Sequence, residues 1–130
     1  MNNKKILISV YGSLRKGFGN HGIIENAKYL GTCTTEPTFS LYSLGGFPGL
    51  KQNGNTSVVI EVYEVNEQEA QWVDSLEGYS EYGNNTFYDK IFIDTPYGEA
   101  GIYIYVPNIS EDRLVKSGDW AENKKQSMFV

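Results

Sequence analysis

A short apolar segment that runs directly into a glycine loop is the feature that most limits how this chain can fold. Residues 6–11 are mostly β-branched or aromatic and are bounded by turn formers, which predicts a buried strand that ends at Gly12. Because glycine has no Cβ, a positive φ at Gly12 would let a ligand approach successive backbone N–H groups, which suit a carboxylate or an amide oxygen. An ordinary strand-ending turn fits the same residues, since a single glycine in a turn usually carries no chemistry.

Length and composition limit the classes of protein that remain. A chain of 130 residues predicts one domain over 1–130, with 118–130 as a candidate mobile tail. One cysteine, Cys33, and one histidine, His21, exclude an internal disulfide and offer no zinc spacing, so we expect no metal. A net charge of -5 argues against a protein that binds nucleic acid. No leader or long apolar segment is visible, so we expect a cytoplasmic protein without membrane attachment. We also expect a monomer or weak dimer.

The residue pattern favours a β-rich fold with tight turns, because the chain has ten tyrosines and fourteen glycines but few helix-forming runs. We expect short helical character within residues 20–29 and strands at 30–35, 38–44, 57–63, 86–94 and 99–106. Asn53-Gly54 predicts a hairpin that joins residues 50–52 to the strand at 57–63, of which one face goes to the core. Residues 95–98 suit the turn of a second hairpin.

Residues 66–77 predict a helix that places a carboxyl group on its buried side. Asn66 and Glu69 have the spacing of a capping box, and Gly78 can end the helix. Glu77 falls on the same face as two apolar positions, and burial, the helix dipole and the like charge of Asp74 would all raise its pKa. A raised carboxyl pKa suits acid/base catalysis near neutral pH. Alternatively, the helix frays at its end and Glu77 points to water.

Aromatic residues elsewhere are candidates for the walls of a pocket. Phe47 lies in a Gly-Gly-Phe-Pro-Gly loop that either connects two strands or presents Phe47 to a ligand. Tyr88, Tyr103 and Tyr105 occupy strand positions from which they could line a pocket, although aromatics in such positions more often serve packing.

Two motifs carry a resemblance to a known family. The segment VYGSLRKG at 10–17, followed by Asn20-His21, resembles the first signature of the γ-glutamylcyclotransferase-like superfamily, nearest to the γ-glutamylamine cyclotransferase and AIG2-like branch. The segment DSLEGY at 74–79 resembles the second signature, in which the glutamate is catalytic. Weaker similarity follows at Tyr88, at 103–106 and at 117–120, while Lys90 stands where the pattern usually has arginine. Lysine offers a flexible point charge instead of a planar fork, so the Glu77 loop could be held less rigidly or the substrate could differ.

The resemblance implies an α+β fold, a small closed mixed β-barrel with a few short flanking helices and a cavity at one end. It implies an enzyme without a cofactor that releases 5-oxoproline and a free amine from a γ-glutamyl amine or γ-glutamyl amino acid. Glu77 would be the general acid/base. The backbone N–H groups of Gly12, Ser13 and Leu14 would hold the α-carboxylate or the oxyanion. Tyr11, Tyr88 and Tyr105 would complete the substrate-binding set.

A protein of the same fold that binds or senses a small metabolite without turnover is the alternative. The presence of Glu77 at the catalytic position of the second signature argues against it.

Overall fold

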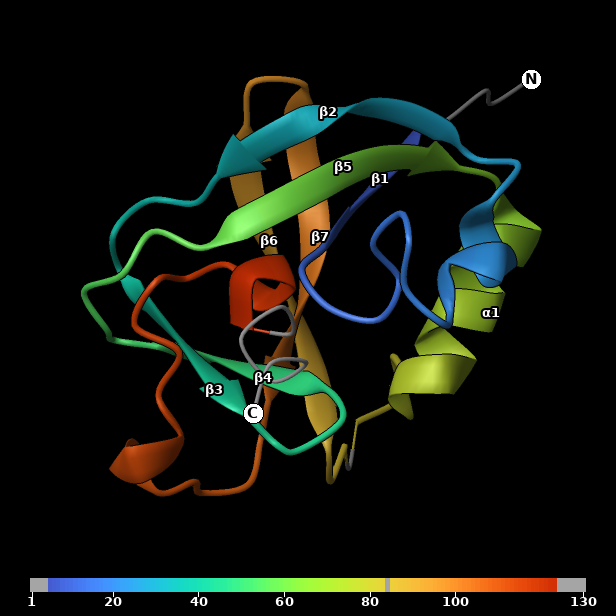
Figure 1. The fold of residues 1–130 in the computed structure, drawn as a ribbon. Helices are drawn as coiled ribbons and strands as arrows, with labels where there is room; N and C mark the ends of the chain where they lie inside the picture. The colour runs from blue at the N-terminus through green and yellow to red at the C-terminus, as the bar shows by residue number, and fades with distance from the viewer. Residues whose placement is uncertain (1–4, 84, 124–130) are drawn as a thin grey trace.

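The computed structural model describes residues 5–83 and 85–123, which form a mixed α+β fold (Figure 1). The described part of the chain contains these strands: β1 (Ile6–Val10), β2 (Lys28–Thr34), β3 (Phe39–Ser43), β4 (Pro48–Gln52), β5 (Val59–Val65), β6 (Tyr88–Thr95) and β7 (Gly98–Tyr105). Its helices include α1 (Glu67–Glu77) and two 3-10 helices, His21–Ile24 and Glu111–Arg113, and residues 120–123 are helical as well. Among these helices none has the length and hydropathy needed to cross a membrane.

The strands form a five-stranded sheet of order β2-β5-β1-β7-β6 and a two-stranded sheet of β3 and β4. β1 is antiparallel to β5 and parallel to β7, so the large sheet is mixed, as predicted. Within the described residues no ladder joins the edge strands β2 and β6. The strand pairings therefore establish a mixed sheet, and closure into a barrel stays a prediction.

The predicted core-facing side of β5 is confirmed, and the opposite face of the strand is covered as well. Ile60 and Val62 belong to one apolar cluster, which also contains Trp120. Tyr63 belongs to a second cluster, which also contains Val73 of α1. The reason is the position of β5 between β2 and β1, with packed layers on either side of the sheet.

The hairpin predicted at Asn53-Gly54 was also wrong, because β4 pairs with β3 and not with β5. Both edges of β5 are occupied by β1 and β2, which leaves no edge for β4. The turn itself forms, with φ of 67° at Asn53, but it folds back on β3: the Gly54 N–H donates to Thr38 O over 3.0 Å. It leads the chain out of the small sheet and toward β5.

α1 has the boundaries that the sequence predicts. The Asn66 side chain accepts a hydrogen bond from the Glu69 N–H, and the Glu69 side chain accepts one from the Asn66 N–H, which completes the capping box. Gly78 ends the helix with φ of 68°, a conformation that glycine adopts without strain. The predicted hairpin of β6 and β7 is confirmed as well.

Part of the candidate tail is packed against the body of the protein. Trp120 is 1% exposed and lies in the cluster around β5, and Asp119 is paired with Arg15. Residues 118–123 are therefore held in place, and residues 124–130 lie outside the described part.

Replacing Asn66 with alanine should lower the free energy of unfolding by about 1 kcal/mol, because the Glu69 N–H loses its acceptor. Gln68→Ala changes an exposed residue in the first turn of the helix, two positions after Asn66. It should leave the free energy of unfolding nearly unchanged. Urea unfolding of the two variants provides the comparison. Equal losses in both would show that the cap does not stabilise α1.

Candidate active site

A cavity of about 570 Å3 lies between the glycine loop after β1, the β3–β4 turn, the end of α1 and the facing ends of β6 and β7. All seven predicted site residues line it: Tyr11, Gly12, Ser13, Leu14, Glu77, Tyr88 and Tyr105. Phe47 lines it too, so the β3–β4 turn both connects two strands and forms a wall.

Gly12 is required for a different reason from the one predicted. Its φ is not positive, so the expected left-handed conformation was wrong. A Cβ at Gly12 would instead lie 2.5 Å from Cγ and 2.6 Å from Cδ of Pro48. The glycine therefore permits the close approach of the loop to the β3–β4 turn, which forms the opposite wall of the cavity.

The first three residues of the glycine loop, Gly12 to Leu14, have backbone donors without an acceptor in the described part of the chain. Arg15 N–H donates to Gly12 O over 3.0 Å, which closes a tight turn across Ser13 and Leu14. Asn20 ties the far end of the loop, because its backbone N–H donates to Ser13 O and its amide side chain to Ser13 Oγ. Within the described residues, the N–H groups of Gly12, Ser13 and Leu14 donate no hydrogen bond. Three consecutive donors are thus available in one wall of the cavity.

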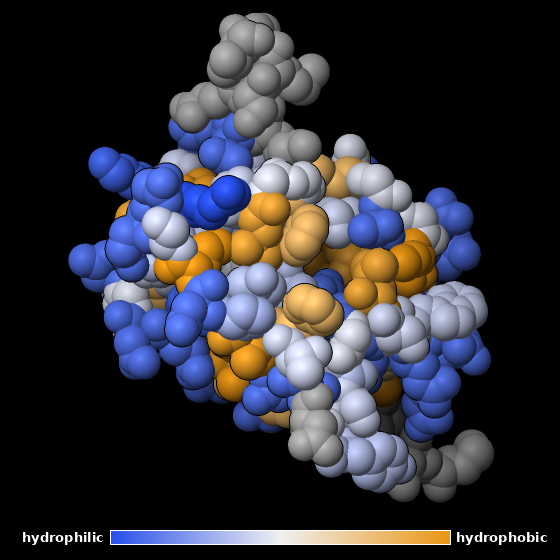
Figure 2. Space-filling model, turned by 90° about the horizontal axis from the view of Figure 1, so that it is seen from below, coloured by the Kyte–Doolittle hydropathy of each residue, from blue (hydrophilic) through white to orange (hydrophobic). Residues whose placement is uncertain are grey.

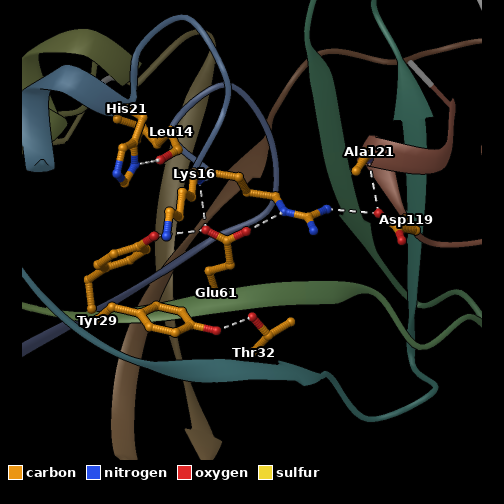
Figure 3. Close-up of polar contacts among 10 residues, drawn as sticks. Leu14, Lys16, His21, Tyr29, Thr32, Glu61, Asp119 and Ala121 are labelled. Atoms are coloured by element: carbon orange, nitrogen blue, oxygen red, sulfur yellow. Dashed lines mark hydrogen bonds and ion pairs between the residues drawn. The ribbon is translucent and has the colours of Figure 1, made fainter. Parts of the chain in front are cut away.

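A buried ion cluster holds this loop to the sheet, and the sequence analysis missed it. Arg15 Nε lies 3.0 Å from Glu61 Oε2 of β5, and Arg15 Nη1 lies 2.8 Å from Asp119 Oδ1. Figure 3 shows Glu61 pointing from β5 toward the loop, with Asp119 on the far side. Neither pairing has a local signal in the sequence, because the partners lie 46 and 104 positions from Arg15.

Further contacts complete the attachment of the loop. The Lys16 N–H and the Tyr63 hydroxyl both donate to Glu61 Oε1, over 2.9 and 2.8 Å. His21 Nδ1 donates to Leu14 O over 2.9 Å, so the lone histidine fixes the loop backbone (Figure 3). The cavity wall is therefore held at several points before any ligand arrives.

Glu77 lies half-buried at the end of α1, one turn after the fully buried Val73. Its carboxyl group makes no hydrogen bond or ion pair with any described residue. Burial raises the pKa of Glu77 from 4.5 to about 7. The protonated and the ionised carboxyl group are therefore both populated near neutral pH, whereas a solvated glutamate is ionised there.

Asp74 does not contribute to this shift, contrary to the prediction. Its carboxylate lies 2.8 Å from Lys90 Nζ and accepts a hydrogen bond from the Tyr103 hydroxyl, so its charge is compensated. Lys90 also lies over the ring of Tyr79, 4.7 Å from its centroid. In this chain the lysine thus anchors the last turn of α1 and Tyr79, two residues beyond its end.

Most of the tyrosine hydroxyls of the cavity are already used as donors. The Tyr11 hydroxyl donates to Tyr103 O over 2.7 Å, and that of Tyr88 donates to Pro48 O over 2.8 Å. Burial is the main cause that raises the pKa of Tyr11, Tyr88 and Tyr103, which excludes them as bases at neutral pH. The Tyr105 hydroxyl makes no hydrogen bond to the described protein and is free for a ligand.

Ser9 is a second feature of the cavity that the sequence analysis missed. It is 1% exposed, it lines the cavity, and its Oγ has no hydrogen-bond partner in the described chain. A buried hydroxyl without a protein partner indicates a polar ligand atom or water. A serine within an otherwise apolar strand is the signal that could have identified it.

Glu77→Gln should change how stability depends on pH. Because the folded-state pKa of Glu77 is raised, its protonated form stabilises the wild type below pH 4.5, and this contribution is lost as the pH rises through about 7. The free energy of unfolding of the variant minus that of the wild type should therefore increase by about 3 kcal/mol between low pH and pH 8. Urea unfolding between these pH values measures it, with the exposed Glu81→Gln as control. Parallel curves for wild type and Glu77→Gln would contradict the buried carboxyl.

Arg15→Leu should lower the free energy of unfolding by about 3 kcal/mol or more, because it leaves the buried Glu61 without its cation. Lys16→Leu is the matched control: it removes the same charge from the same loop but keeps the N–H that Glu61 accepts. Similar losses in the two variants would show that net charge, and not the ion cluster, stabilises the loop.

Comparisons with known proteins show the family to which the chain is related. The family model described as gamma-glutamyl cyclotransferase, AIG2-like, matches residues 8–122. A protein of Vibrio cholerae serotype O1 is 41% identical over 117 residues, covering 89% of this chain and 96% of that protein. YtfP of Escherichia coli strain K12, named a gamma-glutamylcyclotransferase family protein, is 37% identical over 118 residues, covering 91% and 98%.

Solved structures show the same fold. The crystal structure of the uncharacterized protein PH0828 from Pyrococcus horikoshii superimposes with a TM-score of 0.79 at 28% identity, covering 95% of this chain and 97% of that one. The sequence match over residues 8–122 includes the glycine loop, Glu77 and the tyrosines of the cavity. The chain therefore belongs to the AIG2-like gamma-glutamyl cyclotransferase family.

Proposed function

We propose that the protein is a γ-glutamylcyclotransferase-type enzyme that converts a γ-glutamyl amine or γ-glutamyl amino acid into 5-oxoproline and a free amine. The observation that carries this proposal is the unpaired Glu77 carboxyl, with a pKa of about 7, in the same cavity as three free backbone donors. A substrate that holds both an amine and an amide carbonyl needs from the protein only a folded conformation, a proton carrier and donors for negative charge.

In the first step the substrate's α-amine attacks its own γ-carbonyl carbon and closes a five-membered ring. The α-amine attacks in its uncharged form, its nitrogen becomes positively charged as the bond forms, and the Glu77 carboxylate accepts one proton from that nitrogen. The N–H groups of Gly12, Ser13 and Leu14 hold the α-carboxylate or the oxygen that becomes negative as the carbonyl turns tetrahedral. Ser9 Oγ and the Tyr105 hydroxyl are the further free polar groups of the cavity that can orient the glutamyl part.

In the second step the protonated Glu77 gives its proton to the leaving nitrogen, and the bond between that nitrogen and the γ-carbon breaks. The ring carbonyl re-forms, so the products are 5-oxoproline and the amine, and Glu77 returns to its carboxylate. One group performs both transfers, which requires a pKa near the working pH. Tyr11, Tyr88 and Tyr103, whose pKa values are raised by burial, shape the cavity and do not exchange protons.

Glu77→Gln should lower the release of 5-oxoproline by at least about a hundredfold, because the amide cannot carry the proton. The wild type should turn over at least one of γ-glutamyl-ε-lysine, γ-glutamyl-alanine and γ-glutamyl-n-pentylamide. Its kcat/KM should rise with pH and level off above about 7, as Glu77 becomes a carboxylate. Glu81→Gln, which alters an exposed carboxyl outside the cavity, is the control and should keep full activity.

Full activity of Glu77→Gln would overturn the assignment of the proton carrier. Binding of a γ-glutamyl compound by the folded wild type without any 5-oxoproline would favour the metabolite-binding alternative instead.

A further inference from the structure

The cavity has one ionisable acid and no basic side chain among its described lining residues. Glu77 is its only Asp, Glu, Lys, Arg or His. Two cations near the cavity are already engaged: Arg15 with Glu61 and Asp119, and Lys90 with Asp74. Lys51 Nζ donates to Val106 O over 3.0 Å, and Lys51 does not line the cavity.

The γ-glutamyl part of the proposed substrate brings its own α-carboxylate, which the backbone N–H groups of the glycine loop can hold. A leaving amine that is itself an amino acid or a peptide would bring a second carboxylate into a cavity that has no Lys, Arg or His among its described lining residues. Burying a carboxylate without a partner is strongly unfavourable. The charges of the cavity therefore disfavour amino-acid leaving groups.

The mouth of the cavity is apolar. Phe47, Leu76 and Phe87 line the cavity from three separate segments, yet they are 47%, 41% and 61% exposed. Figure 2 views the side of the molecule that holds the β3–β4 turn and the end of α1, and it shows apolar side chains gathered around a hollow. Large apolar side chains that remain exposed around one opening are typical of a surface that contacts an apolar ligand group.

We infer that the leaving amine is an alkylamine or arylamine with an uncharged, apolar substituent. This substituent lies between Phe47, Leu76 and Phe87. The inference rests on the proposed function and specifies its substrate class. It divides the cavity into a polar part, with Ser9, Glu77 and the loop donors, and an apolar part at the mouth. The γ-glutamyl group occupies the first part and the amine substituent the second.

Three γ-glutamyl amides of nearly equal length test the inference, with n-pentylamine, 1,4-diaminobutane or 4-aminobutyrate as the leaving amine. They end in a methyl, an ammonium and a carboxylate group. We expect kcat/KM for 5-oxoproline release to be highest for the pentylamide, with the carboxylate-bearing amide at least about tenfold lower. Equal or greater turnover of the carboxylate-bearing or the ammonium-bearing amide would overturn the inference and leave the proposed function intact. No 5-oxoproline from any of the three amides would overturn the inference, and it would overturn the proposed function as well if γ-glutamyl-ε-lysine and γ-glutamyl-alanine also released none.

Variants of the mouth separate a specific contact from a general loss of structure. Phe47→Ala and Phe87→Ala should each lower kcat/KM for the pentylamide about fivefold to tenfold, with little change for γ-glutamyl-methylamide, whose leaving amine is the shortest. Phe92→Ala removes a phenylalanine that is 63% exposed and lies outside the cavity lining, and it should leave both substrates unaffected. Parallel losses on the two substrates, or none on either, would contradict an apolar subsite at the mouth.

Discussion

The buried pairing of Arg15 with Glu61 and Asp119 is the interaction on which the arrangement of the cavity depends. A buried cation is tolerated only when its partners are in place, and here they come from β5 and from the segment that follows residue 117. The glycine loop can therefore reach its position only when distant parts of the chain have assembled. Because the loop also carries the free N–H donors, the same pairing that satisfies Arg15 sets the wall of the cavity.

The other wall depends on where α1 ends. The capping box at Asn66 fixes the start of the helix, and Gly78 and the Lys90–Asp74 pair fix its last turn. Glu77 is thereby held half-buried and without a partner, while the neighbouring Asp74 is compensated. This contrast explains why two carboxylates three residues apart differ in character. The proton carrier of the proposed reaction is the one that the fold leaves unpaired.

Local features of the fold were predictable because they depend on residues close together in the sequence. The capped helix, the β6–β7 hairpin and the strand before Gly12 follow from periodicity and turn chemistry. The errors concern partners. Asn53-Gly54 forms a turn, but β5 has no free edge for β4; Gly12 is needed because Pro48 approaches it. The seven candidate site residues line one cavity, whereas Ser9 and Arg15 escaped notice because their roles appear only in three dimensions.

The sequence by itself determined the local backbone, the two motifs and, through them, the family to which the chain belongs. Only the tertiary structure decided which charges are paired, which donors stay free and which apolar side chains meet at the mouth of the cavity. The physical reason is the range of the interactions. Backbone conformation is set by neighbours along the chain, but burial and electrostatic compensation arise from contacts such as that between Arg15 and Asp119, 104 positions apart.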